Sequence, residues 1–454
     1  MEESSLDGRT EEEKWKIRWS GFGEELKKLS YMAVPMVAVL VSQYLLRVAS
    51  MVIVGHLGMA AGLETLCGQA YGANQNQKLG TYTYCSIISL IPVCIPISII
   101  WVFLDKLLVL LGQDPEISAV ARKFSVWLIP GLFAYPFLQS LVRYFLCQGI
   151  ILPMLWSSFA ALCLHIPLCW ALVYKANLGI TGAALSVGCA HWFNVVLLGM
   201  YMRYSSSCAE SRALVFRDIF LSIKEFFRFA IPSALMVCLE WWSFEIVILL
   251  AGILPNSKLE ASVLSICVTT TALHFLIPYG ISAAASTRVS NELGAGNPQA
   301  ARFSVYVTVI IGTIEAIIAA ITLFLCRHVY GYLFSNKAEV VNYVREMVPL
   351  ICISLIMDSL QGVLSGVARG SGWQRIGAYA NLGVYYLVGI PISAILCFAV
   401  NMKGKGLWIG MMAGIFVQAL LFALVTGFTN WQKQANNARE RIFERGVVAN
   451  NETG

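Results

Sequence analysis

Eleven apolar runs divide this sequence, and each is long enough to cross a lipid bilayer as a helix. A hydrocarbon core about 30 Å thick needs roughly 20 helical residues, and a spanning segment must satisfy its own backbone polar groups. The runs lie at 31–54, 80–103, 119–142, 153–174, 180–202, 226–251, 259–285, 303–326, 341–366, 377–400 and 406–428. Only 13% of the residues are charged, against about 25% in soluble domains. The sequence therefore predicts an all-α polytopic membrane protein.

The two halves of the chain repeat each other. The matching features are Pro35 to Gly55 with Pro232 to Gly252, Thr65 to Gly72 with Thr287 to Gly294, Leu138-Gln139-Ser140 with Leu360-Gln361-Gly362, and Ile166-Pro167-Leu168 with Ile390-Pro391-Ile392. Paired halves of this kind are typical of transporters that bind their solute near the midplane. The repeat predicts two pseudo-symmetric six-helix lobes.

The first lobe is short by about one helix. Gly55 precedes Thr65 by ten residues, whereas Gly252 precedes Thr287 by thirty-five. Between the first two spans only residues 59–67 are apolar, and nine helical residues reach about 13 Å, too little to cross a bilayer. The missing span falls at the Gly58–Met59 junction.

Polar segments define the predicted domains and their orientation. The parts are an N-terminal tail at 1–30, a first transmembrane lobe at 31–203, a linker at 204–225, a second lobe at 226–428 and a C-terminal tail at 429–454. With the missing span counted, the tails and even-numbered loops hold 21 Lys or Arg and the odd-numbered loops 10. This excess places both tails and the linker in the cytoplasm, and it explains the net charge of +6 without nucleic acid. Without that span the later segments would be inverted, so either 59–67 is re-entrant or the chain is an incomplete twelve-span protein.

Glu240, Glu245 and Asp358 lie inside apolar runs of the second half and are the candidate proton-coupling residues. A carboxylate at the centre of a spanning helix costs roughly 2.5–3.5 kcal/mol on insertion scales, so it is rare without a task such as proton relay. Glu240 and Glu245 are five residues apart and point about 140° from each other on a helix. The alternative for each acid is a hydrogen-bonded role in packing. The first half has no acid in its spans proper, so proton chemistry is expected in the second half.

Aromatic and amide side chains could line a cavity for planar or cationic organic solutes. The candidates are Trp241, Trp242, His274, Tyr279, Gln361, Tyr385 and Gln418. The alternative for each aromatic residue is packing or an interfacial belt. The thirteen cysteines form no CxxC pair and are interpreted as small buried hydrophobes. No metal-ligand spacing, nucleotide loop or nucleophile motif is present, so we expect no metal, no cofactor and no enzyme activity.

Several long strings resemble the multidrug and toxic compound extrusion (MATE) family, above all its plant DETOXIFICATION branch. They are Glu64-Thr65-Leu66-Cys67-Gly68-Gln69-Ala70-Tyr71-Gly72-Ala73, Val54-Gly55-His56-Leu57-Gly58, Arg288-Val289-Ser290-Asn291-Glu292-Leu293-Gly294-Ala295-Gly296 and Leu239-Glu240-Trp241-Trp242. The resemblance covers nearly all of 24–430. The complete second helix of the family pattern is absent here.

The resemblance implies a MATE fold of two six-helix lobes arranged in a V, and efflux of organic compounds in exchange for protons or sodium. It implies that Glu240 on the seventh helix, with Asp358 on the tenth, binds the coupling ion, and it favours H+. It also implies a monomer in the plasma or vacuolar membrane. Two alternatives stay open from the sequence: a truncated or splice-variant product without transport activity, and a membrane-embedded enzyme.

Overall fold

A computed structural model describes residue 55 and residues 58–110, 115–212, 216–251, 254 and 256–451. Predictions that fall elsewhere, namely the tail 1–30, the span 31–54 and the last residues of the C-terminal tail, lie outside the described residues. Within the described ranges every regular element is a helix. Nine of these helices are long and apolar enough to span a membrane, and one bent pair raises the number to ten. The prediction of an all-α polytopic membrane protein is confirmed.

The first lobe begins with the short helix α2, and six further α-helices follow it. One of these, α7, ends in a π-helical turn. Their bounds are α2 (Gly62–Gly72), α3 (Asn76–Val102), α4 (Leu104–Leu110), α5 (Pro115–Leu132), α6 (Ala134–Cys147), α7 (Ile151–Trp170) with the π-helical turn η2 (Ala171–Lys175), and α8 (Ile180–Tyr204). The 3-10 turn η3 (Ser206–Cys208) leads into the linker. The core of the first lobe contains apolar side chains of α2, α3, α6, α8 and the first part of α9.

The second lobe contains longer helices and two separate cores. Its elements are α9 (Phe216–Ala251), α10 (Ser257–Gly294), α11 (Pro298–Leu325), η4 (Tyr330–Leu333), α12 (Ala338–Ser371), α13 (Gln374–Asn381), η5 (Leu382–Gly389), α14 (Ile390–Ala394), η6 (Ile395–Ala399), α15 (Lys403–Gly427) and α16 (Trp431–Asn451). The repeated prolines have similar surroundings, because Pro167 and Pro391 each precede a π-helical turn. In a helix proline removes a backbone hydrogen bond.

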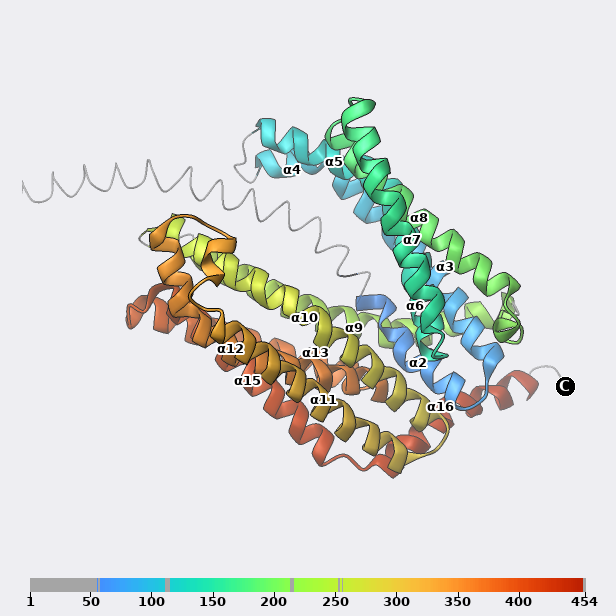
Figure 1. Ribbon diagram of the computed structural model, residues 1–454. Helices are drawn as coiled ribbons and strands as arrows, with labels where there is room; N and C mark the ends of the chain where they lie inside the picture. The colour runs from blue at the N-terminus through green and yellow to red at the C-terminus, as the bar shows by residue number, and fades with distance from the viewer. Residues whose placement is uncertain are drawn as a thin grey trace, which may run out of the picture.

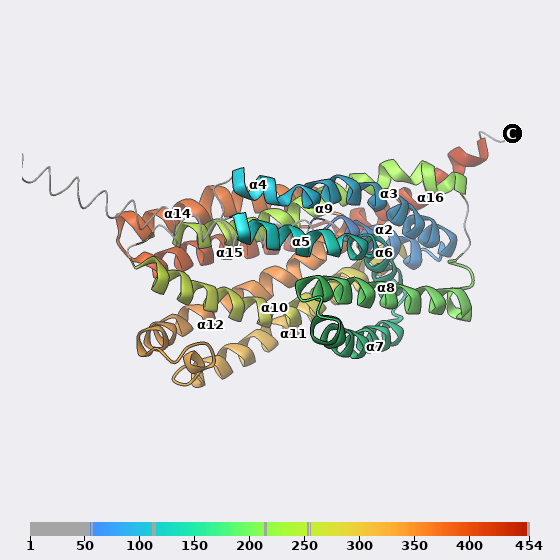
Figure 2. The same ribbon diagram turned by 90° about the horizontal axis from the view of Figure 1, so that it is seen from above.

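The lobes diverge from a common region near α2 and α16. In Figure 1, α3–α8 form one body and α9–α15 the other, and the two separate toward the ends that carry α4 and the start of α12. Figure 2, seen from above, shows that most of the long helices of both lobes run roughly in the same direction. The C-terminal helix α16 lies at the convergent end, where Arg441 donates to the Gln69 side chain of α2 at 2.8 Å.

The convergent end is closed by a seam of small residues, which we define as Gly68 and Gly72 of α2 with Ser290, Asn291 and Gly294 of α10. None of the three glycines has room for a Cβ, because Gly68 faces the Ser290 side chain, Gly72 the Asn291 carbonyl and Gly294 the Gln69 carbonyl. Small residues allow helix backbones to approach this closely. The seam therefore holds the two lobes together on one side of the molecule.

Two helices extend into segments that were predicted as linker and tail. The helix α9 begins at Phe216, inside the segment 204–225 that was predicted as a linker. The segment 429–454 is not only a tail, because α16 packs Trp431 against Trp373 of the second lobe with ring centroids 6.0 Å apart. In both cases helix continues where polar residues suggested a break, because amphipathic helix can lie outside the bilayer.

Candidate functional site

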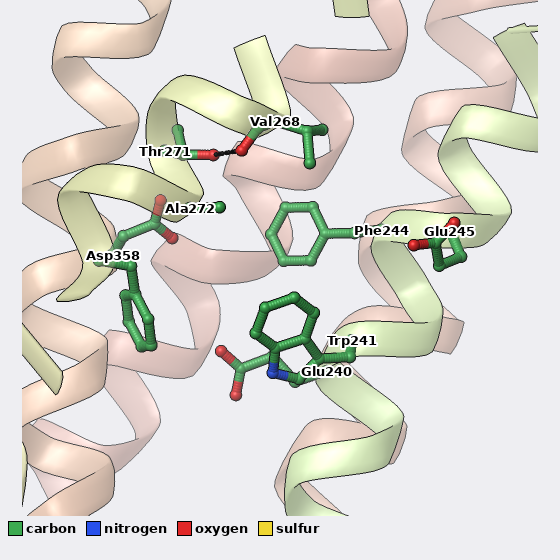
Figure 3. Close-up of a pocket in the computed structure, with 9 residues that line it drawn as sticks. Glu240, Trp241, Phe244, Glu245, Val268, Thr271, Ala272 and Asp358 are labelled. Atoms are coloured by element: carbon green, nitrogen blue, oxygen red, sulfur yellow. Dashed lines mark hydrogen bonds between the residues drawn. The ribbon is translucent and has the colours of Figure 1, made fainter. Parts of the chain in front are cut away.

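The site predicted around Glu240 and Asp358 is a cavity inside the second lobe, between α9, α10 and α12 (Figure 3). Its volume, open mouth included, is about 560 Å³. The lining residues are Glu240, Trp241, Phe244, Glu245, Val268, Thr271, Ala272, Phe275 and Asp358. The walls of the cavity are mostly apolar, and the acidic side chains that line it are Glu240, Glu245 and Asp358.

Glu240 and Asp358 enter this cavity from different helices. In Figure 3 the Asp358 carboxyl extends from α12 and the Glu240 carboxyl from α9 toward the space between them. Glu240 accepts a hydrogen bond from Gln361 Nε2 at 3.3 Å, and Gln361 is itself buried. Among the described residues no Lys, Arg or His lies within ion-pair distance of either acid. Ionising both carboxylates would therefore put two negative charges without a contacting cation in one apolar space.

Glu245 occupies the edge of the cavity and not its centre. Figure 3 shows its carboxyl on the side of α9 away from Asp358. This agrees with the angle that five helical residues impose between Glu240 and Glu245. The two glutamates are not a side-by-side pair, and any role of Glu245 in proton coupling stays a prediction.

Aromatic side chains form the remaining wall. Trp241 and Phe244 come from α9 and Phe275 from α10. The sequence analysis named Trp241 but missed both phenylalanines, although Phe244 follows Glu240 by four residues. On α10 the lining positions are 268, 271, 272 and 275, the spacing of one helix face. That spacing is visible in the sequence, but only the structure shows that this face of α10 is turned toward Glu240 and Asp358.

Other predicted solute ligands lie outside the cavity lining. Tyr385 donates to Gln418 Oε1 at 2.6 Å, and Gln418 Nε2 donates to Asn381 Oδ1 at 2.7 Å. Both Tyr385 and Gln418 are almost fully buried, so this chain of hydrogen bonds joins helices within the lobe. Trp242 is 41% exposed and is absent from the cavity wall. These side chains do not line the cavity around Glu240 and Asp358, and their role as solute ligands stays a prediction.

His274 points to a neighbouring helix instead of the cavity. Its Nε2 lies 3.1 Å from Glu315 Oε1 of α11, and both side chains are largely buried. Glu315 lies within the predicted span 303–326 and was missed by the sequence analysis, although an acid in an apolar run is itself a signal. The pair links α10 to α11 behind the cavity wall.

A cluster of buried charges joins the two lobes beside the seam. Arg369 Nε of α12 donates to Glu64 Oε2 of α2 at 2.9 Å, and Arg143 Nε of α6 lies 3.8 Å from Glu64 Oε1. All three side chains are buried. Tyr279, a predicted solute ligand, is 3.3 Å from Arg143 Nη2 and thus faces this cluster. No local pattern in the sequence indicated that arginines of both lobes would meet Glu64.

No group of three His, Cys, Asp or Glu side chains suited to a metal ion occurs in the described ranges. The cysteines there are free, and nine of the thirteen are buried. The chemistry of the site is therefore that of carboxyl, amide and aromatic groups.

Two helical lobes that converge at one end, with carboxylates in an intramembrane cavity, define a secondary transporter. A model of the MatE family matches residues 30–171 and 232–395, more than half of the chain. The chain belongs to the MATE family of transporters.

Relatives of known sequence and structure agree. Protein DETOXIFICATION 7 of Arabidopsis thaliana is 53% identical over 445 residues, covering 93% of this chain and 89% of the relative. The crystal structure of the eukaryotic MATE transporter AtDTX14 matches with a TM-score of 0.81 at 52% identity, covering 93% of this chain and 100% of that one. An outward-facing MATE family transporter of the MOP superfamily shares the fold with a TM-score of 0.78 at 16% identity, over 92% and 94% of the two chains.

Another relative aligns over a greater length. Protein DETOXIFICATION 9 of Arabidopsis thaliana is 50% identical over 461 residues, covering 96% of this chain and 95% of the relative. That length exceeds the 454 residues of the present chain. The aligned region therefore includes positions of the relative that have no counterpart in this chain.

Proposed function

We propose that this chain is a proton-coupled antiporter that exports small organic compounds, including xenobiotics, from the cytoplasm. Membership of the MATE family supports efflux of organic solutes in general. The observation that carries the proton coupling is that Glu240 and Asp358 share one apolar cavity and that neither acid forms an ion pair with a basic side chain of the described residues. The names of the DETOXIFICATION relatives favour toxic compounds as solutes.

The physical basis of coupling is the cost of charge in this cavity. Two ionised carboxylates in a low-dielectric space repel each other and lose hydration. A proton taken up from the acidic side neutralises one carboxylate. A cationic solute that binds from the cytoplasm compensates the same negative charge when the proton is absent. Proton and solute thus exclude each other, which is the requirement for exchange.

The aromatic wall supports a class of solute. Trp241, Phe244 and Phe275 offer ring faces beside the acids, and such faces attract cations and stack with planar molecules. Most of the solute surface would be buried against apolar side chains, with the carboxylates fixing its orientation. Planar or cationic aromatic compounds fit this site best.

Alternating access requires the closed side to open. The Glu64–Arg369 ion pair and the seam between α2 and α10 join the lobes there. Both must separate before the cavity can reach the opposite side. Positive charge near 204–225 supports a cytoplasmic position for the linker, and the plasma and vacuolar membranes share that orientation.

The test is transport by purified protein in vesicles. An imposed pH gradient should drive ethidium, a planar aromatic cation, into vesicles with an acidic interior, whereas a sodium gradient at equal pH should not. Glu240→Gln should reduce pH-driven uptake to the level of empty vesicles. The control is Glu292→Gln, which alters an acid paired with Arg288 one helical turn away and should leave uptake unchanged. Full uptake by the Glu240→Gln variant, or uptake driven by sodium alone, would refute the proposal.

A further inference from the structure

We propose that a groove between α3, α6 and α8 binds an anionic phospholipid of the surrounding membrane. The groove has a volume of about 1060 Å³, open space included, and lies in the first lobe, outside the cavity that carries Glu240. Its lining residues are Tyr84, Ile87, Ile88, Phe137, Leu141, Val195, Gly199, Met202, Arg203 and Arg212. The inner wall is apolar and suits acyl chains, and no carboxylate is among the lining residues.

Two arginines give the groove its charge. Arg212 Nη1 donates to the carbonyl oxygens of Arg203 and Ser205 at 2.5 and 3.4 Å, and the Tyr84 hydroxyl donates to the Arg212 carbonyl at 3.2 Å. These bonds hold one edge of the guanidinium, while its Nε and Nη2 have no hydrogen bond to the described residues. Arg203 is exposed at the end of α8. Paired guanidiniums are well suited to the oxygens of a phosphate.

The depth of the groove matches the position of a lipid headgroup. Tyr84 and Ile87 lie near the start of α3 at Asn76, and Met202 and Arg203 lie in the last turn of α8, which ends at Tyr204. Arg203 is therefore at the end of a spanning helix, and Arg212 follows η3 in the segment between the lobes. Both are on the side that the distribution of Lys and Arg predicts to be cytoplasmic. Basic pockets between helices at this level bind anionic headgroups.

A second groove in the same lobe provides an internal comparison. It lies between the start of α7 and α8, has a volume of about 1240 Å³ and is lined by apolar residues with Ser157 and Tyr201 as its polar side chains. No basic residue is among its lining residues. Acyl chains can enter both grooves, but only the groove with Arg203 and Arg212 can select a negative headgroup.

The experiment counts lipids that stay bound to the full chain. The protein is purified from vesicles containing phosphatidylcholine and phosphatidylglycerol in equal amounts, and bound lipids are identified by native mass spectrometry. Phosphatidylglycerol should be retained over phosphatidylcholine. Arg203→Gln should weaken retention about five-fold, the value expected for one basic residue near the membrane surface. Arg375→Gln, which removes an exposed arginine from the second lobe, is the matched control.

A second variant fills the acyl part of the groove without removing charge. A Cβ at Gly199 meets no atom within 4 Å, so Gly199→Leu occupies the groove without a backbone clash. It should displace the lipid, whereas Gly427→Leu, at another glycine with open space, should not. Equal retention of both lipids, or unchanged retention in both Arg203→Gln and Gly199→Leu, would overturn the proposal. Neither readout depends on transport, so the outcome is independent of proton coupling.

Discussion

The two lobes repeat one architecture but differ in chemistry and in support. In the second lobe α10 runs for 38 residues, whereas its counterpart in the repeat, α2, runs for 11 within the described residues. The cavity with Glu240 and Asp358 belongs to the second lobe, while the first lobe contributes Glu64 to the contact between lobes. In the proposed mechanism, ion binding is therefore seated in the second lobe and the first lobe acts as its mechanical partner.

A second contrast concerns the span that carries the repeated Leu-Gln pair, Leu138-Gln139 in the first lobe and Leu360-Gln361 in the second. In the second lobe α12 is one helix of 34 residues, and 61% of its most apolar window is buried. The corresponding span of the first lobe is broken into α5 and α6, which meet at an angle of 47°. Pro130 lies two residues before the end of α5 and weakens the helix at that point. The helix α10 packs along α12, whereas α5 packs against α8.

We expect the largest effect at Asp358, because the spans of the first lobe contain no acid. Asp358→Asn keeps the size of the side chain and removes its ability to ionise, so pH-driven ethidium uptake should fall about 100-fold, as for removal of an interaction of about 3 kcal/mol. Ser140→Ala, in the first lobe, should leave the coupling to protons intact. Initial rates in vesicles measure both. A coupled Asp358→Asn transporter would show that the second lobe does not need this acid.

Breaking the charge cluster tests the mechanical role of the first lobe. Glu64→Gln leaves Arg143 and Arg369 buried without a compensating charge, and removal of one partner from a buried pair typically costs 3–5 kcal/mol. Hydrogen exchange of the backbone at 62–72 and 285–294 should therefore accelerate, because the closed seam opens more often. Glu346→Gln, which disturbs the exposed pair with Lys405, should leave these amides protected. Unchanged exchange in Glu64→Gln would remove the cluster from the account.

Glycine variants distinguish the seam from the rest of the first lobe. Gly72→Ala places a Cβ against the Asn291 carbonyl, and such overpacking costs about 1–3 kcal/mol. Gly199→Ala meets open space within α8 and should be neutral or stabilising by about 0.5–1 kcal/mol. Thermal unfolding of the two purified variants measures the difference. Equal melting temperatures would contradict a tight seam at Gly72.

The smallest effect concerns a polar residue of the second lobe outside the cavity. Tyr385→Phe removes the hydrogen bond to Gln418, which should cost about 1 kcal/mol of stability. Ethidium affinity should not change, because Tyr385 does not line the cavity. A large loss of affinity with unaltered stability would restore Tyr385 as a solute ligand.

The fold was more predictable from the sequence than the site. The spans followed from the length of the apolar runs, and the repeat located the missing helix, because both are properties of spacing. Glu240 and Asp358 stood out since acids in apolar runs are rare. By contrast, His274 and Gln418 were assigned to the cavity because composition does not show toward which neighbour a helix face turns. The meeting of Glu64 with Arg143 and Arg369 depends on how the lobes dock, which no local pattern encodes.

Proton release on solute binding tests the central claim most directly. Purified protein in weakly buffered detergent solution near neutral pH is mixed with ethidium, and the pH change is recorded against protein concentration. Competition between proton and solute predicts that the parent releases protons as the solute binds, and that Glu240→Gln and Asp358→Asn release fewer or none. Solute binding by the parent without any proton release would contradict the exchange of the two at this cavity.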